Sequence, residues 1–90
     1  MYQAPVLAYP TREGAFVLDT DATNTGIGAV LSQKQRGEER VIAYFSRSLK
    51  KSERQYCVTR KVLLTLVTAV RHFHHYVHGR HFQVRADHGH

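Results

Sequence analysis

The pattern of hydrophobic and polar positions has two periods along the chain, and the first change between them falls close to residue 50. Before that point apolar and polar residues alternate, as they do in strands with one buried face. Alternating runs predict strands over Ala15–Asp21, Gly26–Gln33 and Arg40–Ser46. A turn signal over 23–26 and a polar loop over 34–39 connect them, so the three strands are expected to be antiparallel.

The segment that follows has the spacing of a helix. Apolar residues recur every three or four positions, which predicts a helix from about Ser52 to His78. Ser52 and Gln55 have the spacing of a capping box at its start, and Gly79 stands where a helix is expected to end. The expected buried stripe consists of Tyr56, Thr59, Leu63, Leu66, Val70, Phe73 and Val77.

Alternation returns at the end of the chain and predicts a fourth strand, Phe82–Asp87. A strand that follows a long helix is expected to run parallel to an earlier strand, because the helix crosses back over the sheet. If the earlier strand is Ala15–Asp21, then Asp21 and Asp87 lie at the same edge of the sheet. The predicted fold class is α/β, with three antiparallel strands, one long helix and a parallel fourth strand.

Length and cysteine content narrow the class of protein further. Ninety residues suffice for one small domain. The only cysteine is Cys57, so neither a disulfide framework nor a CxxC zinc pair is expected, which favours an intracellular compartment, cytoplasmic or nuclear. No apolar run approaches the length of a membrane span, so no membrane partner is expected.

The formal charge of +6 is unevenly distributed. Between positions 47 and 61 the only acidic residue is Glu53, and the basic residues there are Arg47, Lys50, Lys51, Arg54, Arg60 and Lys61. We call these six residues the basic cluster. Two interpretations are open: a surface that binds a nucleic-acid backbone, or the solvated start of a helix.

Four ordered blocks carry a family resemblance: FVLDTDATNTGIGAVLSQ, RVIAYFSRSL, ERQYCVTRKVLL and RHFHHYVHGRHFQVRADH. From about Pro5 to His88 the chain resembles the ribonuclease H domain of gypsy-type (long-terminal-repeat) retrotransposon reverse transcriptases. The resemblance implies a metal-dependent endonuclease that hydrolyses the RNA strand of RNA–DNA hybrids. It also implies an extended lead-in arm over 1–14, which joins the polymerase part of the polyprotein, and an RNase H-like domain over 15–90 that is truncated at its C-terminus.

The resemblance also implies which residues carry the chemistry. Asp21 and Asp87 match two family motifs that supply Mg²⁺ ligands, whereas strand-end aspartates otherwise serve as ordinary turn formers. Magnesium prefers such hard oxygen ligands. Asp19 shares a strand face with Asp21, but the family motif assigns it no ligand role, so it is expected to be a supporting or solvated group.

Two departures from the family pattern imply impaired catalysis and weak or absent Mg²⁺ binding. Val62 stands where the family has a glutamate that bridges the metal ions. Glu53 is more than two helical turns away and cannot replace it. The family's last carboxylate would come from a segment after His90. A non-catalytic nucleic-acid-binding or interaction module, or a remnant without function, is therefore the alternative.

Histidines crowd the end of the chain. They are His72, His74, His75, His78, His81, His88 and His90. His74 and His78 have the i, i+4 spacing that can hold zinc on a helix. The alternative interpretation is a weakly basic helix end, stabilised by the helix dipole and able to contact phosphate when protonated.

Overall fold

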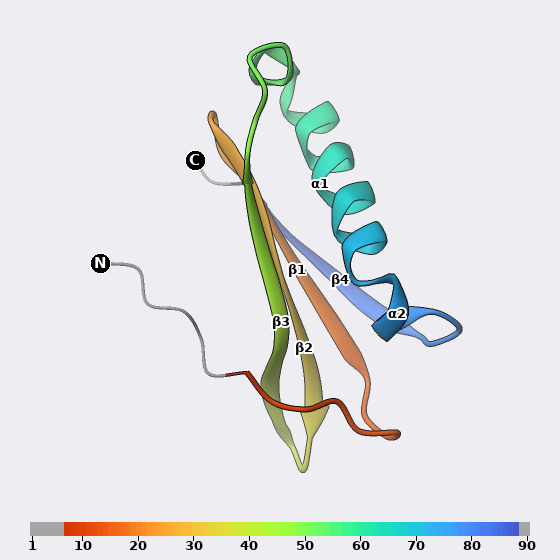
Figure 1. The fold of residues 1–90 in the computed structure, drawn as a ribbon. Coiled ribbons are helices and arrows are strands. Elements are labelled where there is room, and N and C mark those ends of the chain that lie inside the picture. Colours follow the sequence, from red (N-terminus) through yellow and green to blue (C-terminus); the bar gives the residue numbers. More distant parts are fainter. Residues whose placement is uncertain (1–6, 89–90) are drawn as a thin grey trace.

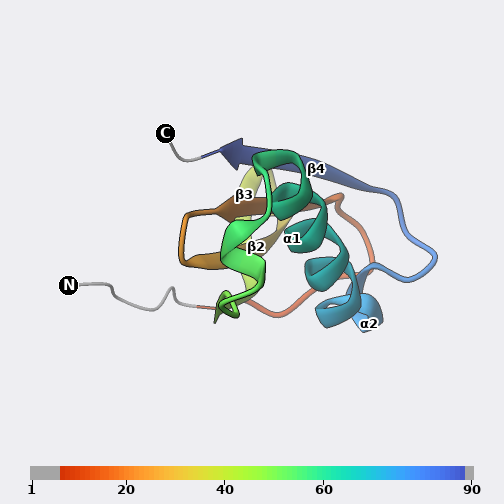
Figure 2. The same cartoon turned by 90° about the horizontal axis from the view of Figure 1, so that it is seen from above.

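The computed structural model describes residues 7–88, which form a four-stranded sheet with helices on one face (Figures 1 and 2). The strands are β1 (Phe16–Ala22), β2 (Gly26–Gln35), β3 (Glu38–Ser48) and β4 (Phe82–His88), in the spatial order β3-β2-β1-β4. β1 pairs antiparallel with β2, and β2 pairs antiparallel with β3. β4 pairs parallel with β1, which confirms the predicted fold class and the helical crossover.

The β2–β3 hairpin is longer than the alternation predicted. Its strands extend to a two-residue turn at Arg36 and Gly37, whose φ angles are 54° and 81°. Positive φ at both central residues defines the turn type whose twist matches that of the flanking strands. Pairing therefore continues through most of the segment that was predicted to be a polar loop.

The prediction of one helix from Ser52 to His78 is wrong in its boundaries and its cap. A short 3-10 helix, η1 (Glu53–Gln55), precedes α1 (Val58–His72) and α2 (His74–Val77). Ser52 has helical backbone angles (φ −66°, ψ −32°) and makes no side-chain cap bond, whereas a capping residue needs extended backbone. The Glu53 carboxylate instead accepts the Lys50 backbone N–H at 2.8 Å, which closes a separate turn before α1.

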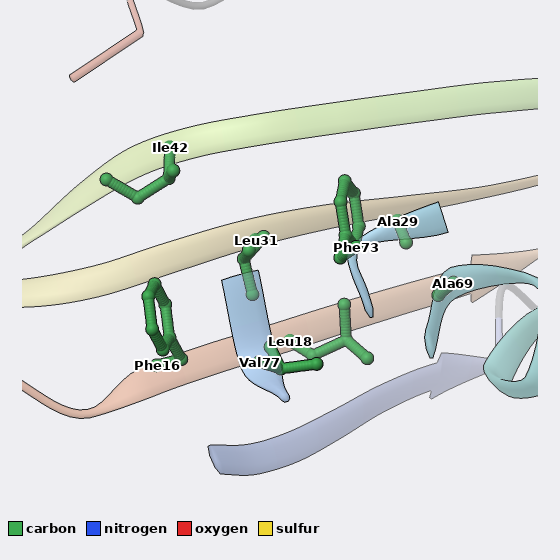
Figure 3. Packing of buried hydrophobic residues seen from close by; sticks show 8 residues of the cluster. All are labelled: Phe16, Leu18, Ala29, Leu31, Ile42, Ala69, Phe73 and Val77. Atoms are coloured by element: carbon green, nitrogen blue, oxygen red, sulfur yellow. The ribbon is translucent and has the colours of Figure 1, made fainter. Parts of the chain in front are cut away.

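The core lies between α1, α2 and the helix side of the sheet. Its buried residues come from β1, β2, β3 and both helices (Figure 3): Phe16, Leu18, Ala29, Leu31, Ile42, Ala69, Phe73 and Val77. Phe73 and Val77 are buried as predicted, but Leu63 is 56% exposed and Thr59 is also exposed. The small residues Thr65 and Ala69 are buried in their place, and Leu66 and Val70 pack against the core while partly exposed.

The described part of the predicted lead-in arm, residues 7–14, lies along the β2–β3 end of the sheet (Figure 1). The Ala8 N–H donates to the Val41 carbonyl at 2.7 Å. Gln33, fully buried on β2, binds the backbone of the segment 11–14 through both ends of its amide. Residues 1–6 of the predicted arm lie outside the described residues.

No helix within residues 7–88 combines the length and apolar character needed to cross a membrane.

Candidate functional site

The face of the sheet that α1 does not cover carries an open hollow. On β1, Leu18 and Thr20 are buried on the helix side, so alternation directs Asp19 and Asp21 to the opposite face. A hollow of about 620 Å³ is bordered by both aspartates, and its other borders include Val30, Tyr44, Ser46 and Arg85. Side chains or backbone from all four strands meet here.

Asp19 is held by Arg85, its cross-strand neighbour on β4. Two guanidinium nitrogens donate to its carboxylate at 2.7 and 2.8 Å, and the same guanidinium donates to Glu39 at 2.8 and 3.2 Å. Hydrogen bonds to Asp19 and then to Glu39 raise the pKa of Arg85 above its ordinary value. Both oxygens of Asp19 are thus engaged by a permanent cation, which fits a supporting role and not that of a metal ligand.

Asp21 lies one residue from the end of β1, and its side chain is exposed. In the register of the sheet its Cα is paired with that of Asp87 on β4. The prediction that the two aspartates share one edge is therefore confirmed for the backbone. The side chain of Asp87 lies outside the part of the chain that the structure describes.

The described donor groups do not fit a pair of magnesium ions. Mg²⁺ needs near-octahedral oxygen coordination, usually from more than one carboxylate when two ions are bound. Asp21 offers one free carboxylate, Asp19 is taken by Arg85, and Val62 offers no oxygen. Among the side chains that the structure describes, no group of three or more His, Cys, Asp or Glu residues could hold a metal.

Val62 is half-buried on the side of α1 that faces the sheet, two turns before Ala69 on the same helix face. Asp21 points to the other face of the sheet. A glutamate at position 62 would therefore have to reach past the end of the strands to share a cation with Asp21. The helix thus presents position 62 toward the sheet. Leu63, the next residue, was predicted to be buried but is exposed and is not part of the core.

The basic cluster is divided by the structure into engaged and free cations. The Arg47 guanidinium binds both oxygens of Glu53 at 2.9 and 3.3 Å. The Arg60 guanidinium lies 4.2 Å from the centre of the Tyr56 ring, and Lys61 is half-buried. The side chains of Lys50, Lys51 and Arg54 are exposed and form no ion pair with another described residue.

Glu53 ties the end of β3 to η1, and its pair with Arg47 predicts a pH effect. Hydrogen bonds from Arg47 and from the Lys50 backbone lower the pKa of Glu53 below its ordinary value of about 4.5. The ionised carboxylate therefore stabilises the fold fully above that ordinary value, and the contribution is lost as the pH falls through the lowered pKa. Glu53→Gln should lower the melting temperature by several degrees at neutral pH and by less in acid.

The matched control is Glu38→Gln. Glu38 pairs with Arg40 at 2.8 Å, but both side chains are more than half exposed, so its loss should change little. Melting curves of the three proteins between pH 3 and pH 7 measure the effect. A Glu53→Gln deficit of the same size at every pH would contradict the assignment of the pH dependence to this carboxylate.

The histidines at the helix end contact each other and nearby aromatic rings. The ring centres of His74 and His78 are 4.8 Å apart, and His72 lies 4.9 Å from Phe45. No third ligand joins His74 and His78 among the described residues, so the zinc interpretation gains no support there. His90 and the side chain of His88 lie outside the described part.

Sequence reasoning did not find the roles of Arg85 and Glu39. The alternation placed Arg85 on the same strand face as Asp87, but its partner became visible only when the register set it beside Asp19. Glu39 lies in the segment that was predicted to be a loop. No motif marks either residue, because their roles arise from contacts between strands that are distant in sequence.

Comparisons with known proteins agree with this fold and its motifs. Residues 1–84 match the family model of the RNase H-like domain found in reverse transcriptase. Two Drosophila melanogaster relatives are the retrovirus-related Pol polyproteins from transposon 297, 43% identical over 84 residues, and from transposon opus, 43% identical over 74 residues. These matches cover 93% and 82% of this chain. The chain belongs to the family of RNase H-like domains of retroelement reverse transcriptases and Pol polyproteins.

The chain spans only 8% and 7% of the lengths of these two relatives. Among solved structures, the foamy viral protease-reverse transcriptase in complex with dsDNA matches 89% of this chain and 16% of its own, with a TM-score of 0.78 and 21% identity. The same enzyme in complex with an RNA/DNA hybrid matches 82% of this chain and 10% of its own, with a TM-score of 0.66 and 20% identity. At these identities the likeness is one of fold.

Proposed function

We propose that this chain is an RNase H-like domain whose ancestral reaction is hydrolysis of the RNA strand of RNA–DNA hybrids, and that catalysis is impaired in it. The pairing of Asp21 with Asp87 at the ends of β1 and β4 carries the proposal, because it brings two matched carboxylate positions to one edge. Val62 accounts for the impairment, since its side chain supplies no metal ligand. Mg²⁺ is the proposed cofactor, bound weakly or not at all.

The proposed partners are an RNA–DNA hybrid or another nucleic acid and, in the intact element, the polymerase part of the polyprotein. The foamy viral enzyme, which shares the fold, is known in complex with an RNA/DNA hybrid. We propose a cytoplasmic or nuclear location. A non-catalytic nucleic-acid-binding module is the second candidate, and the exposed side chains of Lys50, Lys51 and Arg54 favour it.

The test of the impaired site is Val62→Glu. It restores the family's carboxylate but adds repulsion toward the aspartates, so without metal it should be neutral or destabilising. Mg²⁺ at millimolar concentration should then raise its melting temperature more than that of the wild type, because the ion binds the folded state. Hybrid cleavage should stay poor in both proteins.

Val62→Gln is the matched control, because glutamine has nearly the shape of the glutamate in Val62→Glu but carries no charge. Its response to Mg²⁺ should equal that of the wild type. If Val62→Glu also responds like the wild type, position 62 does not contribute to a metal site and the proposed cause of impairment is wrong. Efficient hybrid cleavage by the wild type would equally contradict the proposal.

A further inference from the structure

A second group of cations lies at the opposite end of the sheet from the basic cluster. The segment 11–14 and the β2–β3 hairpin enclose a hollow of about 880 Å³. Its charged borders are Arg12, Lys34, Arg36 and Arg40, against Glu13. Figure 1 shows the hairpin tip and the β3–η1 connection at opposite ends of the molecule. β2 alone is ten residues long, which separates the two groups by roughly 30 Å.

Three of these cations are free to bind an anion. Arg40 pairs with Glu38 at 2.8 Å, so its charge is largely balanced. The side chains of Arg12, Lys34 and Arg36 are exposed, and none forms an ion pair or a side-chain hydrogen bond with another described residue. Like charges gathered on one hollow repel one another, so the arrangement is most favourable when an anion is present.

Arg36 occupies a backbone position that disfavours it. Its φ of 54° is the only positive value among the non-glycine residues that the structure describes. A residue with a side chain costs about 1–2 kcal/mol in this conformation, and turns of this type prefer Asn before Gly. Strain at an exposed position suggests that the side chain has a role beyond folding. Here the turn holds a guanidinium at the tip of the hairpin.

The other wall of the hollow is held rigidly. The Gln33 side-chain amide donates to the carbonyls of Thr11, Glu13 and Gly14 at 2.9, 3.1 and 3.2 Å. Gly14 has a φ of 108°, and a Cβ there would clash with the Lys34 carbonyl oxygen. The segment that carries Arg12 is therefore packed directly against the strand that carries Lys34, and little ordering remains to be done on binding.

We propose that this hollow is a second phosphate-binding site, at which Arg12, Lys34 and Arg36 contact the backbone of a nucleic acid; this inference rests on the proposed nucleic-acid binding. Guanidinium groups match phosphate oxygens in pairs of hydrogen bonds. A protein partner would need an apolar anchor, and Ala8 is the only apolar side chain bordering the hollow among the described residues. The site is separate from Lys50, Lys51 and Arg54, and it can be tested independently of them.

Arg36→Asn separates binding from folding. It removes one charge and installs the Asn-Gly pair that the turn prefers, so the melting temperature should stay equal or rise. The affinity for a short fluorescein-labelled RNA–DNA hybrid, measured by anisotropy, should fall several-fold. The slope of log K against log salt is negative, and it should become shallower by about 0.9 for each phosphate that the variant no longer neutralises. Lys34→Gln should act in the same direction.

Arg71→Gln is the matched control, because it removes one exposed charge from the outer side of α1. If Arg36→Asn and Lys34→Gln bind like Arg71→Gln, the second site is overturned. If glutamines at 50, 51 and 54 abolish binding while Arg36→Asn leaves it intact, this inference fails and the proposed nucleic-acid binding survives. Failure of the wild type to bind the hybrid at low salt would overturn both the second site and the proposed nucleic-acid binding.

Discussion

Replacing Gln33 with leucine is expected to lower the free energy of unfolding by about 1–3 kcal/mol. The side chain is fully buried, and its Oε1 accepts the Thr11 backbone N–H at 2.8 Å while Nε2 donates to three carbonyls. Leucine fills a similar volume but leaves the Thr11 N–H without its acceptor. It also removes one donor from each of the three carbonyls, which keep only the Arg80 guanidinium or the Thr11 hydroxyl as partners. Such a loss is a large fraction of the roughly 5–15 kcal/mol that typically stabilises a domain.

Urea unfolding followed by circular dichroism measures this loss. The control is Gln35→Leu, because Gln35 is only half-buried and donates to the Tyr9 carbonyl and to Gln33. Gln35→Leu should lower the free energy of unfolding by less than about 1 kcal/mol. Trypsin should also cleave after Arg12 faster in Gln33→Leu than in the wild type. Equal stability of the two variants would show that the segment 11–14 is not anchored by Gln33.

Neutralising Lys50, Lys51 and Arg54 together with glutamine is expected to weaken hybrid binding roughly tenfold or more at low salt. These are the free cations of the basic cluster, so the variant removes charge without breaking the pair of Arg47 with Glu53. Binding should be independent of sequence, because phosphate contacts carry no base information. The negative slope of log K against log salt should become shallower by about 0.9 for each phosphate that the three cations neutralise in the wild type.

Fluorescence anisotropy at several salt concentrations measures both quantities, and melting curves confirm that the variant is folded. Arg71→Gln again serves as the control for a general change in net charge. The triple variant should lose affinity for duplex DNA by about the same factor as it loses affinity for the hybrid. An unchanged affinity and slope would mean that the basic cluster is a solvated surface, which is the alternative interpretation of the sequence.

Much of the fold could be predicted because it follows from local periodicity. Alternation located the strands, and the helix between the third and fourth strands required a parallel pairing for β4. The breaks before Val58 and at Phe73 could not be predicted, since no proline or glycine marks them. The buried face of α1 was also missed in part, because Thr65 and Ala69 are small and contribute little to a hydrophobic pattern.

The candidate site shows the same division. Alternation and register are enough to bring the backbones of Asp21 and Asp87 together. They do not reveal that Arg85 engages Asp19, or that Glu53 engages Arg47, because each pair depends on how separate elements meet. Charge counting likewise found six basic residues near the helix start, but only the structure distinguishes the engaged cations from the free ones.

The parallel pairing of β1 with β4 also has a consequence for the order of folding. β1, β2 and β3 are joined by short turns, whereas the hydrogen bonds of Arg85 with Asp19 join residues 66 positions apart. Closing a longer loop costs more entropy, and distant pairings tend to form later. The hairpins are thus expected to assemble first and β4 to dock afterwards. Asp21 and Asp87 become neighbours only in this last step, so the sheet edge that carries both aspartates is completed late in folding.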